Sequence, residues 1–485
     1  MNWFSAAVMV GLWWCAATVA APPWPSYVIT NFVDEFNGAS LDTNVWKVDG
    51  YRTNVTVTGG NLQLITALDG GTAWREGFIY SRLFSQKYGY YEARIKINNA
   101  SGLNNAFWLN SPYGIAYDNV DRLEIDITES HYADRTSHMT LHDWSPTHSS
   151  MGEDYVHGSD LSTDYHLFGL EWAHDNTLRF YFDGSNKWTI SASTFLGLNS
   201  LIPQAVLFST KVIPWAGTPD TNVLIGSHMD VDWVRVYQKR GWSGVLNGNW
   251  GSATNWGPDG VPTDSDAAIF NQPATTTAIS LAADKSCQSL YFCNPQCPAF
   301  TFAAGVYALH LGAAPAGIGG ITIETTVTNS QTINLDLYAD RDLQFGNFSR
   351  TPGVTLVLNG QLTATNTGRA LFFGGLGPIA VNGSISSNIA TVTKFSNNEL
   401  VLTATNRHTG LTIVLNGTLV VAADSALGTT NAATIVTNGA TLAFTSNVTY
   451  TALEPIRLDG IGDTAAGRAG ALDLDTGPAP VSPAA

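Results

Sequence analysis

Apolar and polar residues alternate in many short runs over the first half of the chain. In Asn61–Ile65 and Leu178–Phe182, for example, apolar side chains recur at roughly every second position. A period of two places these side chains on one face of a half-buried antiparallel strand. Asp183-Gly184 is a turn pair typical of hairpins, and no long stretch keeps a helical apolar period. The pattern over residues 25–240 therefore predicts a β-sandwich.

A different pattern begins after Lys239-Arg240-Gly241. The segment 241–275 is a junction rich in Gly, Trp and Asn, and beyond it charged residues are rare. A strand, an Asn-Gly turn and a second strand then recur in four segments: 357–362, 380–385, 414–419 and 436–442. Short repeated strands bury their apolar faces when each turn stacks on the next. Residues 276–485 are therefore expected to form a β-solenoid, with a second sandwich as the alternative.

The stretch from Val392 through Asn406 to Gly428 resembles the passenger repeats of bacterial autotransporter-like surface proteins. The resemblance covers one or two repeats, and repeats of this kind are loosely defined. Two interpretations stay open for the repeat region: a truncated passenger, or a spacer.

Composition and charge narrow the class of protein. The chain has 485 residues, enough for two or three domains, of which 44% are hydrophobic and only 13% charged. Gly, Thr, Asn, Ser and Ala fill the difference, as in β-rich extracellular proteins with many turns. The net charge of −16 argues against a nucleic-acid partner, because little is present to neutralise phosphates. We expect a monomer whose partner is a polysaccharide.

The N-terminus predicts export. Ala6–Ala17 is an uncharged apolar run, and Thr18-Val19-Ala20 is a small-residue cleavage signal, so residues 1–20 are interpreted as a secretory signal peptide. The alternative is a buried N-terminal strand. The run is too short for a confident membrane span, and Pro22-Pro23 ends it. We therefore expect a secreted or cell-surface protein with no transmembrane span in the mature chain.

Cysteine usage suggests one local crosslink. Cys15 would be removed with the signal peptide, which leaves Cys287, Cys293 and Cys297 in one short stretch. An odd number allows one disulfide and one spare thiol. No His or further Cys lies nearby at the spacing of zinc ligands. A local disulfide in an exported protein is the expectation, with its pairing open.

Three acidic residues stand in the segment Leu123–Glu129. In a regular strand side chains alternate, so Glu124 and Asp126 share one face while their apolar neighbours point into the core. Glu129 has the opposite parity. A β-bulge between Asp126 and Glu129 would add one residue and return Glu129 to the carboxylate face. Only with such a bulge would all three carboxyls lie on one face of the strand.

Such a face suits the hydrolysis of glycosidic bonds. Cleavage with retention needs two carboxyls about 5–5.5 Å apart, one as nucleophile and one as proton donor. A third acid between them can share a proton and couple their titrations. The plain alternative is a solvated acidic strand. The strict alternation of apolar positions and the aromatic flanks favour the catalytic interpretation.

The same region resembles glycoside hydrolase family 16, the laminarinase, lichenase, agarase and carrageenase group. The resemblance covers residues 30–238, and its motifs occur in the order of the family: Asp34–Gly38, Gly60–Leu62, Tyr88–Arg94, Asn105–Leu109, Glu124–Glu129, His166–Gly184 and Asp230–Tyr237. It implies a β-jelly-roll with an open cleft across the concave sheet. It also implies Glu124 as the nucleophile, Asp126 as the helper and Glu129 as the acid/base.

Four further residues are candidates for binding the substrate. Trp and Tyr rings stack on the apolar faces of sugars, and Trp108 aligns with the cleft tryptophan of the family. His142 and Trp144 lie two apart and share a face, and Arg75 could bind a hydroxyl or an anionic group. The alternatives are a core position for Trp108, a satisfied polar group for His142 and a loop surface for Arg75.

No cofactor is expected for catalysis. Members of the family often hold a structural calcium ion on the convex side, and Glu35 and Asp232 match positions that contribute oxygens. Calcium needs several oxygen ligands, so two acids are a weak signal for this site.

The function predicted from the sequence is therefore a secreted retaining endo-β-glycosidase. A β-1,3- or β-1,3-1,4-glucan is the first choice of substrate, and a galactan of the agar, porphyran or carrageenan type is the alternative. Two segments depart from the usual laminarinase pattern: Asn104–Phe107 stands where many have Trp-Pro-Ala-Phe, and Phe208–Val212 lacks their Asn-rich strand. A non-catalytic glycan-binding adhesin and a transglycosylase are the competing classes.

Overall fold

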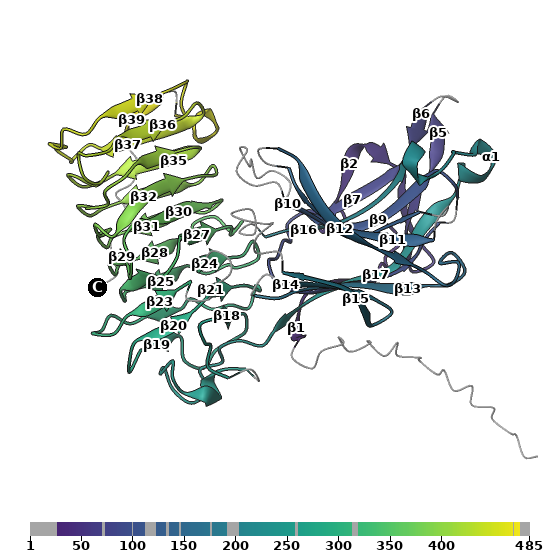
Figure 1. The fold of residues 1–485 in the computed structure, drawn as a ribbon, viewed down its shortest axis with the longest axis horizontal. Helices are drawn as coiled ribbons and strands as arrows, with labels where there is room; N and C mark the ends of the chain where they lie inside the picture. Colours follow the sequence, from purple (N-terminus) through teal and green to yellow (C-terminus); the bar gives the residue numbers. More distant parts are fainter. Residues whose placement is uncertain are drawn as a thin grey trace, which may run out of the picture.

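The computed structural model describes residues 27–69, 73–98, 100–111, 123–131, 135–144, 147–174, 177–191, 203–257, 260–312, 319–468 and 470–475. The expected signal peptide and Cys15 lie outside these residues. The described part consists of two β-rich halves, which lie side by side in Figure 1. Within it, no helix has the length and apolar character needed to cross a membrane.

The first half is a sandwich of two antiparallel sheets. One sheet has the order β15-β14-β13-β8-β17-β4-β3, with β1 also paired to β17, and the other has the order β12-β11-β10-β9-β16-β7-β2. Its strands are β1 Tyr27–Asp34, β2 Trp46–Thr53, β3 Val55–Thr58, β4 Asn61–Ile65, β7 Gly77–Ser81, β8 Gly89–Lys96, β9 Leu103–Asn110, β10 Leu123–His131, β11 Thr136–Asp143, β12 Ser149–Val156, β13 His166–Trp172, β14 Thr177–Phe182, β15 Ser185–Ser191, β16 Ala205–Val212 and β17 His228–Lys239. A hairpin of β5 Ala67–Asp69 and β6 Ala73–Arg75, the short 3-10 turn Pro214–Ala216 and helix α1 Thr221–Leu224 complete this half. The predicted jelly-roll sandwich is confirmed.

The alternation seen in the sequence decides which face of each strand is buried. On β9 and β10, Phe107, Leu109, Leu123 and Ile125 point between the two sheets and are fully buried. The side chains of opposite parity lie on the other face of the seven-stranded sheet, which we call the site face. This sheet therefore has an apolar side that joins the core and a side that can present polar groups.

The second half is a parallel β-solenoid, as predicted. Successive turns contribute strands to two nine-stranded sheets and one four-stranded sheet, and every pairing between turns is parallel. The first sheet contains β18 Ala267–Phe270, β21 Ser289–Phe292, β24 Gly319–Ile323, β27 Leu343–Asn347, β30 Arg369–Gly375, β32 Ile389–Lys394, β34 Thr412–Val414, β36 Thr434–Val436 and β38 Ile456–Leu458. The second contains β19 Ala278–Ile279, β22 Thr301–Phe302, β25 Gln331–Ile333, β28 Leu356–Leu358, β31 Ile379–Val381, β33 Glu399–Leu402, β35 Gly417–Val421, β37 Ala440–Thr445 and β39 Leu472–Asp475. The third contains β20 Lys285–Cys287, β23 Leu309–Leu311, β26 Leu337–Ala339 and β29 Leu362–Ala364. Two 3-10 turns, Ala253–Asn255 and Thr464–Ala466, lie near the two ends of this half.

The repeated Asn-Gly pairs form corners of the solenoid where neighbouring turns touch. Asn382 donates to Asn359, and Asn359 donates to Asn334 one turn earlier. A Cβ added at Gly383 would lie 1.8 Å from the carbonyl oxygen of Gly360, so only glycine allows this approach. Asparagine ladders and stacked glycines therefore fix the spacing between these turns.

The Gly/Trp/Asn-rich stretch is the first turn of the solenoid. Strand β18, inside this stretch, pairs with β21, and Trp242, Trp250 and Trp256 pack in the solenoid core. Where the chain enters the solenoid, the backbone of Gly241 lies close to that of Ile269. A Cβ on Gly241 would lie 1.9 Å from the carbonyl oxygen of Ile269. The tryptophans cap the apolar core, a role that terminal turns of repeat proteins need.

The expectation of a local disulfide is wrong. Cys287, Cys293 and Cys297 are all free and buried. Cys287 and Cys297 lie in the solenoid core, whereas Cys293 packs against the core of the sandwich. All three serve as small apolar side chains of the packed cores, and their closeness in sequence does not bring about a crosslink.

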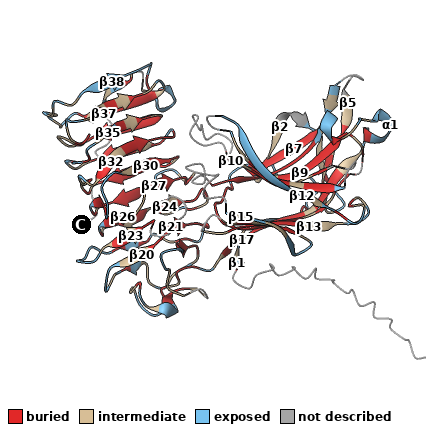
Figure 2. Ribbon diagram, viewed as in Figure 1, coloured by how far each residue is buried: buried red, intermediate tan, exposed pale blue. Residues whose placement is uncertain are grey.

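The two halves share part of their core. Ala267, Ile269, Tyr291 and Cys293 of the solenoid belong to the same apolar cluster as the sandwich core. Figure 2 shows buried residues throughout both halves, with exposed positions gathered on outer strands such as β12 and β38. The solenoid therefore packs tightly against the sandwich rather than only following it.

Candidate active site

Strand β10 contains the predicted bulge. On neighbouring β11, Asp126 faces Thr140 and Glu129 faces His138, so three steps on β10 match two steps on β11. The pairing with β9 shifts between Asp126 and Thr128 as well. The bulge returns Glu129 to the site face, beside Glu124 and Asp126. The conditional prediction made from parity is confirmed.

Polar side chains gather around Glu124 and Asp126. The Asn110 side-chain amide donates to Oε2 of Glu124 at 2.8 Å, and Nε2 of His142 lies 3.2 Å from Oδ2 of Asp126. One ligand-type atom from each of Glu124, Asp126 and His142 lies within 4.8 Å of the other two. These side chains come from three adjacent strands, β9, β10 and β11, and their closeness follows from the register of the sheet.

Burial makes two negative charges at this position unfavourable. Asp126 is only 3% exposed. Burial, and then the charge of Glu129, raises the pKa of Asp126 well above its ordinary value. Burial, and then the charge of Asp126, raises the pKa of Glu124, while His142 and a hydrogen bond from Trp144 act in the opposite direction. This environment therefore favours the protonated forms of both carboxyls.

Glu129 has a different set of neighbours. The side-chain amide of Asn104 donates to Oε1 of Glu129 at 2.7 Å. Asn104 lies on β9 and is buried, with only 5% of its surface exposed. On the other side, His138 faces Glu129 across the strand pair and contacts Asp154 through Nδ1 at 2.6 Å. Each outer carboxyl of the trio thus accepts from a different asparagine of β9.

The candidate substrate-binding residues fall into two groups. Trp108 lies on the site face opposite Asp126, packs beside Phe78 and donates from Nε1 to Ser209 at 3.1 Å. It is therefore not a core residue between the sheets. Arg75 lies on the exposed hairpin strand β6, outside the seven-stranded sheet.

His142 and Trp144 do come together, and a third ring joins them. The rings of Trp144 and His148 stack with centroids 3.8 Å apart, and Nδ1 of His142 lies 2.8 Å from Nε2 of His148. Trp144 keeps 40% of its surface exposed. This stack lies next to Glu124 and presents a flat aromatic surface of the kind that sugars bind.

Sequence reasoning missed Asn104, Asn110, His138 and His148. The two asparagines are separated from Trp108 by even numbers of residues, so strand alternation could have placed them on the same face as Trp108. The residues that they contact depend on the register between β9 and β10, and a single sequence does not show that register. His148 lies in a segment without a periodic pattern.

Glu35 and Asp232, the candidate calcium ligands, each face an arginine. Arg235 donates from Nε and Nη2 to the two oxygens of Glu35 at 2.8 and 3.0 Å, and Arg94 pairs with Asp232. A guanidinium on each carboxylate does not provide the oxygen-rich shell that calcium needs. These two residues as placed do not fit the ion, and the calcium site stays an untested prediction.

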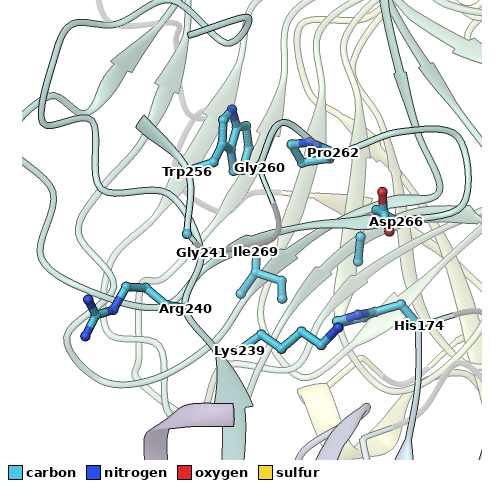
Figure 3. Close-up of a pocket in the computed structure, with 11 residues that line it drawn as sticks. His174, Lys239, Arg240, Gly241, Trp256, Gly260, Pro262, Asp266 and Ile269 are labelled. Carbon is cyan, nitrogen blue, oxygen red and sulfur yellow. The ribbon is translucent and has the colours of Figure 1, made fainter. Parts of the chain in front are cut away.

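A pocket lies at the junction of the two halves, apart from the carboxylates. Figure 3 shows His174 and Lys239 pointing toward each other within it, with Arg240, Trp256 and Asp266 around them. His174 is half-buried, and loss of hydration lowers its pKa to about 3, so its ring is neutral. The pocket contains none of the candidate catalytic residues.

Comparisons with known proteins agree with this geometry. Residues 27–239 match the family model described as the GH16 domain of β-porphyranases A–D. This part of the chain belongs to glycoside hydrolase family 16. The family 16 domain is 29% identical over 240 residues to β-porphyranase E of Zobellia galactanivorans, an alignment that covers 43% of this chain and 86% of that protein.

Two glucan-degrading enzymes also match. A β-glucanase of Acetivibrio thermocellus is 31% identical over 186 residues, covering 36% of this chain and 51% of the relative. The solved structure of a non-specific endo-β-1,3(4)-glucanase of family 16 aligns with a TM-score of 0.39 and 26% identity, covering 44% of this chain and 92% of that one. The family confirms the predicted enzyme class, a retaining endo-acting glycoside hydrolase whose substrate is a polysaccharide.

Proposed function

We propose that this enzyme cleaves a galactan of the porphyran type, with Glu124 as nucleophile, Asp126 as helper and Glu129 as acid/base. The observation that carries the assignment of roles is the bulge in β10, which brings three carboxyls of one short segment onto one face. Two of them accept hydrogen bonds from asparagines, and the middle one contacts a histidine. In this proposal Glu124 acts as the ionised carboxyl and Glu129 as the protonated one.

In the first step, a carboxylate oxygen of Glu124 attacks the anomeric carbon of the sugar. The bond from that carbon to the glycosidic oxygen breaks, and Glu129 transfers its proton to the departing oxygen. Asp126 carries a proton at the start of this step, and Glu124 is ionised when it attacks. As negative charge leaves Glu124, the repulsion between the two carboxyls disappears, so Asp126 can then release its proton at lower cost.

In the second step, water releases the sugar. Glu129, now ionised, takes a proton from a water molecule, and the oxygen of that water attacks the anomeric carbon. The ester bond to Glu124 breaks, and the carboxylate of Glu124 is restored. Two displacements at the same carbon give net retention of configuration. A sugar hydroxyl in place of the water would give transglycosylation.

The choice of a galactan is supported by the similarity of the whole first domain to β-porphyranases. The family model that matches it is described for β-porphyranases, and the Zobellia galactanivorans relative named above is a β-porphyranase. The segment Asn104–Phe107 also departs from the laminarinase pattern Trp-Pro-Ala-Phe. Trp108 and the Trp144–His148 stack would contact sugar faces on either side of the carboxyls. Arg75 is a candidate for an outer subsite.

A β-1,3- or β-1,3-1,4-glucan is the second candidate, because the Acetivibrio thermocellus β-glucanase is 31% identical to this domain. The experiment is to incubate the purified full-length enzyme with porphyran, agarose, laminarin and mixed-linkage β-glucan and to measure reducing ends. We expect release of oligosaccharides from porphyran. Cleavage of laminarin or mixed-linkage glucan alone would overturn the galactan assignment. Binding without cleavage of any polymer would favour an adhesin.

The roles of the two outer carboxyls can be separated with azide. Azide added to Glu124→Ala should give a glycosyl azide of inverted configuration, because the small anion fills the place of the missing nucleophile. Azide added to Glu129→Ala should give the retained configuration, because it attacks the intermediate on Glu124. Exchange of these two outcomes would reverse the assignment, and unchanged hydrolysis by either variant would contradict it.

Export is part of the same proposal. It is supported by the apolar run and cleavage signal in residues 1–20 and by the polymeric nature of the substrate, which is too large to enter a cell intact. N-terminal sequencing of protein recovered from the culture medium should give a chain that starts after Ala20. Retention of the full chain inside the cells would contradict export.

A further inference from the structure

We propose that Asn104 is a positioning residue that decides which oxygen of Glu129 carries the catalytic proton. This inference rests on the proposed role of Glu129 as acid/base. It assigns a function to a residue of β9 that was not among the sequence candidates. The proton delivered to the glycosidic oxygen is expected on Oε2, because Oε1 is engaged by the amide of Asn104.

The contact between the two side chains is short and sheltered. Nδ2 of Asn104 lies 2.7 Å from Oε1 of Glu129, and Asn104 is 5% exposed. Oδ1 of Asn104 is buried and has no hydrogen-bond partner among the described residues. An amide with one end unsatisfied in a buried position is costly. The hydrogen bond from Nδ2 of Asn104 to Glu129 gives a reason for an asparagine at this position despite that cost.

The chemistry follows from what each oxygen of a carboxylic acid can do. The carbonyl oxygen of the protonated acid is a better hydrogen-bond acceptor than its hydroxyl oxygen. An N–H donor fixed on Oε1 therefore favours the form with Oε1 as carbonyl and Oε2 as hydroxyl. The side chain is also held in one orientation by this bond. Asn104 thus selects both the position of the acid and the oxygen that donates, which a general acid needs to reach the leaving oxygen.

The same position also separates this domain from many laminarinases. Asn104 stands where their Trp-Pro-Ala-Phe segment has its tryptophan. An indole N–H lies further from the backbone and has a different direction from an asparagine amide. The replacement of that tryptophan by Asn104 therefore explains why an asparagine contacts the acid/base in this chain.

Asn110 provides a matched control on the same strand. Its amide donates to Oε2 of Glu124 at 2.8 Å, so it serves the nucleophile in the way that Asn104 serves the acid. The nucleophile is needed for every substrate, whereas the acid is needed only when the leaving group is a poor one. Asn104→Leu and Asn110→Leu each remove one amide and keep a side chain of similar size.

The experiment compares kcat/KM for two substrates of the full-length enzyme. One is the polysaccharide identified by the panel, and the other is a 2,4-dinitrophenyl β-glycoside of its oligosaccharide, whose leaving group needs no proton. For Asn104→Leu we expect a loss of about 10- to 100-fold on the polysaccharide and less than about 3-fold on the aryl glycoside, within the contribution of a general acid. For Asn110→Leu we expect similar losses on both substrates.

Equal losses on both substrates for Asn104→Leu, with an unchanged melting temperature, would overturn the inference. A fall in melting temperature together with equal losses would point to a merely structural role and would overturn it as well. Glu129→Ala is measured in parallel. If this variant does not itself lose the polysaccharide activity selectively, the proposed acid/base role fails, and this failure is distinct from failure of the role of Asn104.

Discussion

The raised pKa values of Glu124 and Asp126 have consequences for stability at the scale of single residues. Both carboxyls have a raised pKa in the folded protein, first because they are buried and then because a further carboxyl lies near each of them, Asp126 for Glu124 and Glu129 for Asp126. A group whose folded pKa is raised stabilises the fold below its unfolded pKa, and this stabilisation is lost as the pH rises through the folded pKa. The catalytic face is therefore a source of instability at neutral and alkaline pH.

Asp126→Asn should lower activity and raise stability. The amide cannot release a proton, so we expect kcat to fall by about 10- to 100-fold, as for the loss of a helper in proton transfer. The melting temperature should exceed that of the wild type at pH 8, and the difference should shrink toward pH 4, where the carboxyls are protonated. Calorimetry at several pH values measures this. The exposed Glu153→Gln on β12 is the control, and an advantage independent of pH would contradict the explanation.

At the residue scale, the sequence predicted the carboxyls but not their partners. Strand parity alone places Glu124 and Asp126 on one face, and the family resemblance supplies the bulge that Glu129 requires. The partners Asn104 and Asn110 follow from register, which depends on how β9 packs against β10. Cys287, Cys293 and Cys297 show the opposite case, because their spacing suggested a disulfide, whereas all three are free thiols buried in the two cores.

The bulge is the feature that matters at the scale of elements. Ile127 faces no residue in the pairing of β10 with either β9 or β11. If Ile127 is removed, Asp126, Thr128 and Glu129 face Trp108, Phe107 and Ala106 in unbroken order. The partner positions on β11 also become consecutive. The bulge can therefore be removed without moving Glu129 to the other face.

Deletion of Ile127 should leave an active enzyme. We expect activity within about 100-fold of the wild type, and a stability loss of about 1.5–3 kcal/mol from the missing buried side chain. Insertion of one alanine after Thr128 is the matched comparison, because a further residue turns Glu129 into the core and should abolish activity. Reducing-end assays and thermal melts measure both effects. An inactive but folded deletion variant would show that the bulge has a further role.

At the scale of the whole molecule, the solenoid completes the catalytic domain. Glu324, which follows β24, accepts a hydrogen bond from the backbone N–H of Lys87 at 3.0 Å. Its carboxylate also contacts the hydroxyl of Tyr291. The repeat pattern of the second half predicted a solenoid domain after the sandwich, and that prediction came from local periodicity alone. The contacts that join the halves link residues more than 200 positions apart, which no local pattern reveals.

The buried Glu324 makes the junction of the two halves sensitive to pH. Burial raises the pKa of Glu324 to about 8, against opposing hydrogen bonds from Tyr291 and Lys87. The folded pKa is raised, so its contribution to stability is complete below pH about 4.5 and is lost as the pH rises through about 8. Ionisation places a charge in the interface that the hydrogen bonds and the charge of Lys87 offset only in part. Oε2 of Glu324 is buried and has no hydrogen-bond partner among the described residues.

Glu324→Gln should therefore make the junction less dependent on pH. The uncharged amide keeps an oxygen for the Lys87 N–H, so we expect a melting temperature near that of the wild type at pH 5 and above it at pH 9. Thermal melts of the full-length chain across this range, with the exposed Glu153→Gln as the control, measure the difference. Because the two cores share residues, the wild type and Glu324→Gln should each melt in one transition at pH 5. At pH 9 the wild type should melt in two transitions, one for each half. Identical pH profiles for Glu324→Gln and the wild type would mean that Glu324 does not control the stability of the junction.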